Sequence, residues 1–417
     1  MPLLSRNSAF SRVTALAARR QVHAAFAWLH GNPKTIMDWQ KELVAIPAPP
    51  FGEQARAEWI SARFSEIGLR RVEIDAAGNV LGWLPAADLP PESTGPVVLL
   101  SAHLDTVFPA STPLQPILDG DRLTCPGASD NGAGVAGMLA IARALVESEM
   151  RLPVPLLFAG NVGEEGEGDL RGVRHIYGTP LAGRIAAHLV LDGAGTDAAV
   201  TQALGSSRFQ VTITGPGGHS FTDAGTPNPI AALACALAAL AETPLPADPR
   251  TTLNLGTIRG GTSVNSIPES ARASIDFRST DTEQLLRLEV ALHGAVKDAV
   301  ERMNAQASGD GINRGRLAST IECIGERPAA SLPADAPLLA SLRAVDRHLG
   351  LRTDLRLGST DANIPLSLGV QALSLGAGGE GGSAHTVAEW FSGKDREVGL
   401  RRVLLLTLAT LEWAAEQ

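Results

Sequence analysis

The sequence predicts an α/β protein in which a central mixed, mostly parallel sheet is flanked by helices and a second α/β unit is inserted. The 417 residues are too many for one compact core, so two domains are expected. From about residue 97, short apolar runs alternate with helical stretches, a pattern typical of a parallel sheet. Between about residues 207 and 326 the order becomes strand, helix, strand, strand, helix, strand, which is typical of a split βαβ unit.

The elements of the first unit follow from these runs. Strands are expected at residues 97–101, 154–159, 187–191 and 371–375, and helices at residues 134–147 and 396–415. Near the N-terminus, apolar residues at helical spacing over residues 13–29 predict one amphipathic helix that packs on the domain. An organellar transit peptide is the alternative, because residues 1–37 contain no acidic side chain and carry Arg6, Arg12, Arg19 and Arg20.

The inserted unit is predicted to be a ferredoxin-like βαββαβ domain. Its strands are expected at residues 208–214, 251–259, 271–279 and 317–325, and its helices at residues 229–242 and 282–306. Because this unit closes on itself, the predicted domains are residues 1–206, 207–326 and 327–417. The last of these completes the sheet of the first.

Composition excludes several classes of protein. The chain has 35 Lys and Arg against 44 Asp and Glu, a net charge of −9, and no basic stripe, so no nucleic-acid partner is expected. No apolar run approaches the roughly 18 residues of a membrane span, so no membrane partner is expected either. Cys125, Cys235 and Cys323 are odd in number and far apart, which favours a reducing, cytoplasmic compartment.

Candidate ligands fall where the predicted strands end. His103 and Asp105 follow the strand at 97–101, and Glu164 and Glu165 follow the strand at 154–159. In an open α/β sheet the carboxyl ends of the strands share one edge, where ligands bind. The same edge is expected to receive three further residues, at the end of a strand, at the opening of a helix and in a Gly-rich stretch after a strand, namely Asp192, Asp130 and His385.

Two imidazoles and three carboxylates form a ligand set that suits Zn²⁺, and also Co²⁺ or Mn²⁺. A shared carboxylate can hold two such ions about 3.5–4 Å apart. Each residue alone has a more ordinary interpretation, as a core His, a helix N-cap or a solvated Glu pair. Five such positions converging on one sheet edge favour the metal interpretation.

These residues resemble the M20 family of zinc metallopeptidases and amidohydrolases. The resemblance runs from about residue 36 to the C-terminus, in the family's order. It implies a zinc-exopeptidase-like fold whose inserted domain is a lid and dimerisation domain, and hence a homodimer. The motifs that carry it include His103 and Asp105, Ser129 and Asp130, Glu164 and Glu165, Asp192, His219, residues 358–363 and His385.

The resemblance also implies roles for the metal-site residues, with two Zn²⁺ per subunit. Asp130 would bridge the ions, with His103 and Asp192 completing one site and Glu165 and His385 the other. Glu164 would be the general base that takes a proton from a water held between the ions. Asp105 would hold the ring of His103 through its carboxylate and fix the tautomer.

Three residues of the inserted domain resemble positions that contact substrate. His219 would reach the active site of the partner subunit; the alternative is a loop His that caps the following helix. Asn265 and Arg278 resemble lid positions, and the planar fork of Arg278 suits a free carboxylate. Closure of the lid would exclude water from the site.

Within this resemblance, Asp192 favours cleavage of a peptide bond in a small peptide, since the family's deacylases tend to have Glu there. The alternative is an N-acyl-amino-acid amidohydrolase. A third interpretation, a silent binding or scaffolding protein, is disfavoured because Glu164, Asp105 and all five ligand positions are intact.

Overall fold

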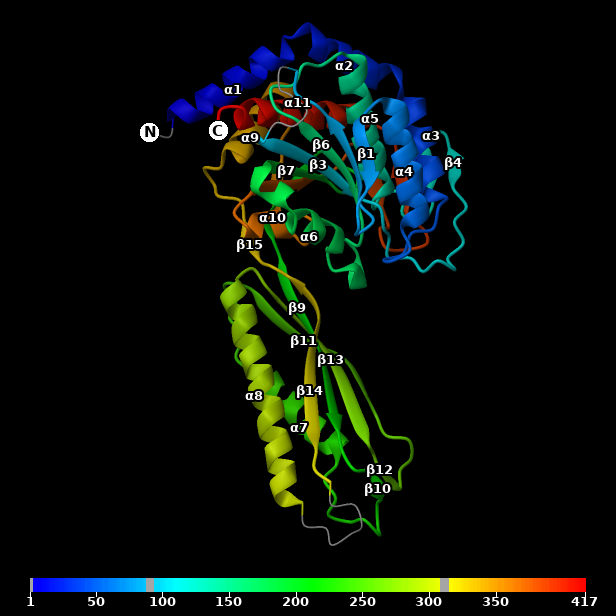
Figure 1. Ribbon diagram of the computed structural model, residues 1–417, viewed down its shortest axis with the longest axis vertical. Coiled ribbons are helices and arrows are strands. Elements are labelled where there is room, and N and C mark those ends of the chain that lie inside the picture. The colour runs from blue at the N-terminus through cyan, green and yellow to red at the C-terminus, as the bar shows by residue number, and fades with distance from the viewer. Residues whose placement is uncertain (1–2, 88–93, 308–314) are drawn as a thin grey trace. The chain divides into compact units, whose positions relative to one another are not determined.

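The computed structural model describes residues 3–87, 94–307 and 315–417, with side chains from residue 9 onward (Figure 1). The chain divides into two compact units. One comprises Met1–Ala203 together with Ser331–Gln417, and the other comprises Leu204–Ala330. The segment expected as an insertion, residues 207–326, lies within the second unit.

The first unit is built on a nine-stranded mixed sheet in the order β1-β2-β6-β3-β7-β17-β8-β15, with β16 paired to β8. Its centre is parallel, because β3 pairs in parallel with β6 and β7, and β7 with β17. The predicted mixed sheet is therefore confirmed. The bounds are β1 Arg70–Ile74, β2 Val80–Leu84, β3 Val97–His103, β6 Leu156–Asn161, β7 Ile185–Leu191, β8 Ala198–Ala203, β15 Ala330–Ser331, β16 Asp354–Gly358 and β17 Gln371–Leu375.

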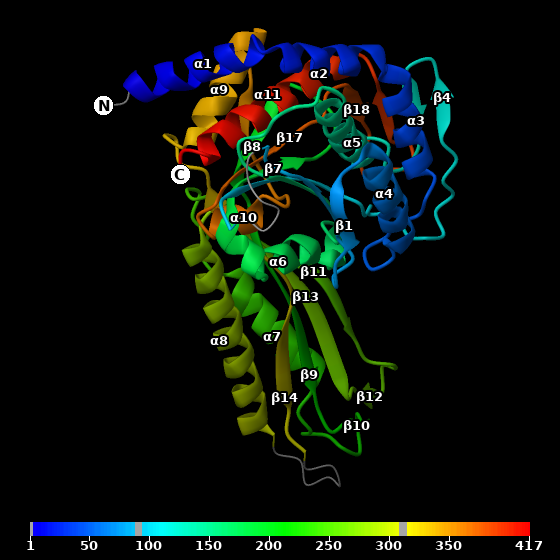
Figure 2. The ribbon, with the colours of Figure 1, turned by 45° about the horizontal axis from the view of Figure 1, so that its top comes forward.

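Helices cover this sheet and bury its central strands. Every residue of β3 and β6 is buried, as expected for parallel strands covered on both faces. Helices α5 and α11 pack against β3. Helix α11 also contacts α2 and α5, which lie beside it in Figure 2. The helices of this unit are α1 Leu3–Ala17, α2 Arg20–Gly31, α3 Pro33–Val44, α4 Gln54–Ile67, α5 Gly132–Glu147, α6 Arg171–Tyr177, α9 Pro337–Leu349, α10 Asn363–Ser367 and α11 Arg396–Ala414, with short 3₁₀ turns at Gly166–Gly168 and Pro180–Arg184.

The prediction of a single helix over residues 13–29 is wrong. Two helices, α1 and α2, occupy this segment and meet at Ala18 and Arg19, where Arg19 has the extended backbone of an N-cap (φ −70°, ψ 136°). Helix α2 still buries an apolar stripe of Val22, Ala25 and Leu29. The prediction of helical structure was therefore correct, but the break between α1 and α2 was not predicted. Met1 and Pro2 lie outside the described residues.

The second unit is a four-stranded antiparallel sheet in the order β11-β13-β9-β14. Its core forms where α7 and α8 pack on the sheet through residues such as Phe277, Leu233 and Leu288. Asn228 and Asp281 cap the two helices through their side chains. The chain order is the predicted β-α-β-β-α-β, with β9 Gly205–Thr214, α7 Pro229–Ala241, β11 Thr251–Gly260, β13 Ser270–Ser279, α8 Thr282–Gln306 and β14 Ala318–Arg327, plus the short β10 Gly218–His219 and β12 Ser266–Ile267.

Several elements were not expected from the sequence. A small sheet in the order β18-β19-β5-β4 contains Glu380–Gly382, Trp390–Ser392, Arg122–Thr124 and Ile117–Asp119. Strands β1 and β16 are mostly exposed, so they lack the continuous apolar run that marks a buried strand. All three cysteines are free thiols. Within the described residues, no helix is both long and apolar enough to cross a membrane.

Candidate metal centre

The candidate ligands collect at the carboxyl ends of three parallel strands. His103 is the last residue of β3, and Glu165 follows β6 by four residues. Asp192 follows β7 directly, where its N–H donates to the carbonyl of Leu375 on β17 (2.8 Å). This is the edge at which the sequence analysis expected the ligands to meet.

Asp130 lies at the centre of the cluster, with one carboxylate oxygen facing each imidazole. Asp130 Oδ1 is 3.1 Å from His103 Nε2, and Asp130 Oδ2 is 3.0 Å from His385 Nε2. His103 Nε2 is also 3.7 Å from Asp192 Oδ1, and His385 Nε2 is 3.1 Å from Glu165 Oε1. The cluster thus divides into two triads that share Asp130, and the ligand atoms of each triad lie within 4.8 Å of one another.

The cluster is rich in negative charge, because Asp105 and Glu164 add to the three carboxylates of the triads. Burial, together with the charge of Asp130, raises the pKa of Glu165 to about 7. Although burial opposes it, hydrogen bonding to His103 and His385 holds the pKa of Asp130 well below its usual range. Asp130 Oδ1 is buried and faces His103 Nε2 at 3.1 Å. An excess of buried carboxylate is the environment that a bound cation stabilises.

Asp105 is fully buried beside His103, but its carboxylate is outside hydrogen-bond distance of the imidazole. Its carboxylate Oδ1 lies 3.7 Å from His103 Nδ1, which is too far for a hydrogen bond, whereas the backbone carbonyl of Asp105 lies 3.1 Å from this nitrogen. The carboxylate instead accepts the N–H groups of Glu164 (3.0 Å) and Glu165 (2.7 Å). Asp105 therefore fixes the backbone that carries the two glutamates.

The loop that carries Asp130 is held by Glu389, a residue that the sequence analysis missed. The Glu389 carboxylate is fully buried and accepts three backbone N–H groups, from Gly127 (3.0 Å), Ser129 (2.8 Å) and Asp130 (2.7 Å). Because it lies 259 residues from Asp130 in the chain, no local pattern connects the two residues. The available signal was its position four residues after His385.

Asn131 links the Asp130 loop to the Asp192 loop. Helix α5 begins at Gly132 with Asn131 as its N-cap, so Asp130 precedes the helix rather than opening it. The Asn131 side chain accepts hydrogen bonds from Gly134 N (3.1 Å) and Gly193 N (3.0 Å) and donates to Leu191 O (2.9 Å). One amide thus caps the helix and fixes the strand end next to Asp192.

The stretch 358–363, which belongs to the family-like motifs of the sequence, provides a buried carboxylate. Asp361 is fully buried and accepts a hydrogen bond from Asn161 Nδ2 (2.7 Å) at the end of β6. Burial raises the pKa of Asp361 to about 7. Asn363 Oδ1 accepts the N–H of Thr360 (2.9 Å), which closes the turn before α10.

The three expected substrate-contacting residues lie in the second unit, and only two of them are neighbours. His219 and Asn265 belong to adjacent segments, since β10 pairs with β12 and Ser220 N donates to Asn265 O (3.0 Å). Arg278 lies near the opposite end of β13, eight residues beyond Ser270, a span of about 26 Å at strand spacing. Its Nε donates to Asp276 (2.8 Å). Within this unit, Arg278 is therefore not part of the same group as His219 and Asn265.

His219 caps its own turn. Its Nδ1 accepts the N–H groups of Phe221 (3.2 Å) and Thr222 (3.4 Å), and its ring is exposed. The following helix, α7, is capped by Asn228 instead. The alternative interpretation is therefore correct in placing His219 in a loop, but wrong in making it the cap of α7.

The sequence matches one protein family over most of its length. Residues 99–409 match the family described as Peptidase family M20/M25/M40. A probable carboxypeptidase from Aspergillus clavatus is 30% identical over 297 residues, which are 65% of this chain and 63% of that protein. The chain thus covers less than two thirds of this relative's length.

Solved structures share the fold across both units. A tripeptidase from Staphylococcus aureus superposes with a TM-score of 0.72 at 22% identity, covering 93% of this chain and 99% of the other. The YxeP protein of Bacillus subtilis, described as a dinuclear metal-binding peptidase from the M20 family, superposes with a TM-score of 0.63 at 15% identity, covering 91% and 98% of the two chains. The chain therefore belongs to peptidase family M20/M25/M40.

Proposed function

We propose that the chain hydrolyses the peptide bond of small peptides at a centre that binds two metal ions. The observation that carries this proposal is the position of Asp130 between two imidazoles, with one oxygen 3.1 Å from His103 Nε2 and the other 3.0 Å from His385 Nε2. A carboxylate shared in this way is suited to bridge two cations. The dinuclear description of the Bacillus subtilis structural neighbour supports the same arrangement.

The residues present fit a pair of divalent ions. His103, Asp130 and Asp192 would hold one ion, and Asp130, Glu165 and His385 the other. Nitrogen and oxygen donors of this kind suit Zn²⁺, with Co²⁺ and Mn²⁺ as alternatives. When bound, the ions supply Lewis-acid activation of the scissile carbonyl and of the attacking water.

Glu164 is the proposed general base. Its carboxylate is buried, and a carboxylate oxygen lies within 4.8 Å of ligand atoms of both His103 and Glu165. Asp105 fixes its backbone through the hydrogen bond to Glu164 N (3.0 Å). From this position Glu164 takes a proton from the attacking water and returns it to the leaving nitrogen.

Peptides are preferred over N-acyl amino acids as the substrate class. Asp192 at the third ligand position favours a peptidase, as argued from the sequence, and the tripeptidase and carboxypeptidase descriptions of the two similar proteins agree. The alternative remains an N-acyl-amino-acid amidohydrolase of the same family.

Two substrate panels separate these alternatives. We expect the zinc-loaded protein to hydrolyse members of a panel of di- and tripeptides, with kcat/KM at least about tenfold higher than for any N-acetyl amino acid. A tenfold ratio corresponds to about 1.4 kcal/mol of differential transition-state binding. Exclusive turnover of the N-acetyl panel would overturn the peptide proposal but not the metal centre.

His219 and Asn265 are proposed to contact substrate together, since they are neighbours in the second unit.

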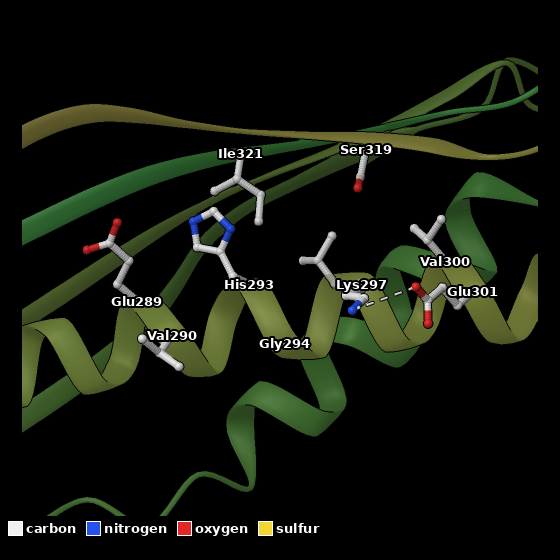
Figure 3. Close-up of a pocket in the computed structure, with 10 residues that line it drawn as sticks. Glu289, Val290, His293, Gly294, Lys297, Val300, Glu301, Ser319 and Ile321 are labelled. Atoms are coloured by element: carbon white, nitrogen blue, oxygen red, sulfur yellow. Dashed lines mark ion pairs between the residues drawn. The ribbon is translucent and has the colours of Figure 1, made fainter.

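The two edges of that unit's sheet differ, because β14 lies beside α8 at one edge while β11 ends the other. Figure 3 shows His293 of α8 next to Ile321 of β14, in a cavity of about 750 Å³. Close to it, Val290 of α8 is 72% exposed.

We propose a homodimer in which α8 and the edge strand β14 meet a second copy of the chain, because an unpaired edge beside exposed apolar side chains favours self-association. Val290→Glu should shift the mass measured by sedimentation equilibrium from dimer to monomer. Leu255→Glu is the matched control, since Leu255 is 38% exposed on β11, at the other edge of the sheet. A wild-type monomer, or equal dissociation of both variants, would rule out this interface.

A further inference from the structure

A second cavity lies in the first unit, and its lining includes none of the candidate metal ligands. Its volume is about 660 Å³, within the range of about 300–1,000 Å³ typical of small-molecule sites. It is formed by α2, α3, β4 with the loop after it, and residues 393–400, which lead into and begin α11. Its apolar wall comprises Leu29, Ile36, Met37, Leu118, Val398 and Leu400.

Arg396, at the start of α11, also lines this cavity and is a buried cation without an acidic partner in the described part of the chain. Its side chain is only 5% exposed. Its contacts are a hydrogen bond to Gln40 Oε1 and the ring of Phe391, whose centroid lies 4.0 Å from the guanidinium carbon. Its Nη1 has no hydrogen-bond partner among the described residues. Burial lowers the pKa of Arg396 to about 9.

The other charged groups around the cavity do not neutralise Arg396. Lys34 pairs with Asp38 at 2.7 Å, Lys394 with Glu380 at 2.9 Å, and Glu397 with His30 at 2.8 Å. Asp121 and Asp395 also line the cavity, but both are exposed to solvent. A buried charge is stable only when it is paired or fully hydrogen-bonded. At this cavity, Arg396 is therefore the group that a bound anion would stabilise.

We propose that this cavity is a second binding site, separate from the metal centre, for a small molecule that combines a carboxylate with an apolar chain. The carboxylate pairs with the guanidinium of Arg396, where Nη1 has N–H donors that no described residue accepts. The chain packs on the apolar wall around Ile36 and Leu118. Gln40 connects the site to the loop that carries Asp130, because it accepts from Arg396 and donates to Ala128 O (2.5 Å), two residues before Asp130.

Calorimetric titration of the zinc-loaded full-length protein tests this proposal, with hexanoate as the probe. Hexanol and hexylamine carry the same chain without the carboxylate. We expect hexanoate to bind one equivalent per chain, and both comparison compounds to bind at least tenfold more weakly. Absence of hexanoate binding, or equally tight binding of hexanol, would overturn the proposal.

Two variants locate the bound hexanoate. Arg396→Met should weaken hexanoate binding at least tenfold, while Arg143→Met, which removes a half-buried arginine of α5 that pairs with Glu147, should leave it unchanged. If Arg396→Met does not fold, Val398→Trp fills the cavity without altering the arginine, because Val398 is 36% exposed on the first turn of α11. A carboxylate held by the metals would bind both Arg396→Met and Val398→Trp as tightly as wild type, and that result would also overturn the proposal.

Discussion

Replacing Glu164 with Gln is expected to lower kcat by about 10²–10⁴-fold, the contribution typical of a positioned general base. The amide cannot accept a proton from the attacking water, yet it has nearly the same size as the carboxylate. The backbone hydrogen bond from Glu164 N to Asp105 does not involve the side chain, so the loop should keep its position. KM and metal content should therefore stay near the wild-type values while kcat falls.

Glu167→Gln is the matched control for this change. Glu167 lies in the same loop, but its side chain is exposed and it belongs to neither ligand triad. Its kcat should equal that of the wild type. Steady-state kinetics on a peptide substrate, with metal content measured on the same samples, makes the comparison. Wild-type kcat in Glu164→Gln would remove this residue from the proton transfer.

Replacing Asp130 with Ala is expected to affect both metal sites at once. Asp130 is the residue that the two triads share, so its loss removes a ligand from each. It also leaves His103 and His385 without the carboxylate that lies 3.1 and 3.0 Å from their Nε2 atoms. Metal content should fall from two ions to fewer than one per chain. Because metal ions provide several kcal/mol of transition-state stabilisation, kcat/KM should fall about 10³-fold or more.

Asp197→Asn controls for loss of a surface charge. The Asp197 side chain is 71% exposed and pairs with Arg356 at 3.1 Å. Metal content and kcat/KM should be unchanged in this variant. Elemental analysis after dialysis against metal-free buffer gives the ion count, and circular dichroism shows whether each variant is folded. A folded Asp130→Ala protein that keeps two tightly bound ions would show that Asp130 is not the shared ligand.

The sequence predicted the parts of this molecule that depend on continuous local patterns. The buried strands β3, β6, β7 and β17 carry apolar runs, so their positions were predicted to within two residues. Because parallel strands present their carboxyl ends at one edge, the meeting of His103, Glu165 and Asp192 followed from the same patterns. Strands without such a run, including β1 and β16, were missed.

The remaining differences arise from contacts between distant segments. Glu389 holds the Asp130 loop through three hydrogen bonds across about 260 residues of chain, and a single sequence does not encode such a pairing in its local pattern. The resemblance implied that Asp105 holds His103 through its carboxylate. In the structure this carboxylate accepts the N–H groups of Glu164 and Glu165 and lies 3.7 Å from His103 Nδ1.

The number of metal ions bound by the wild-type chain tests the central claim most directly. The metal-free protein would be titrated with Zn²⁺ while peptide hydrolysis and bound metal are followed on the same sample. Two triads that share Asp130 predict that binding saturates at two ions per chain and that full activity requires both. Saturation at one ion with full activity, or full activity in the metal-free protein, would contradict the account.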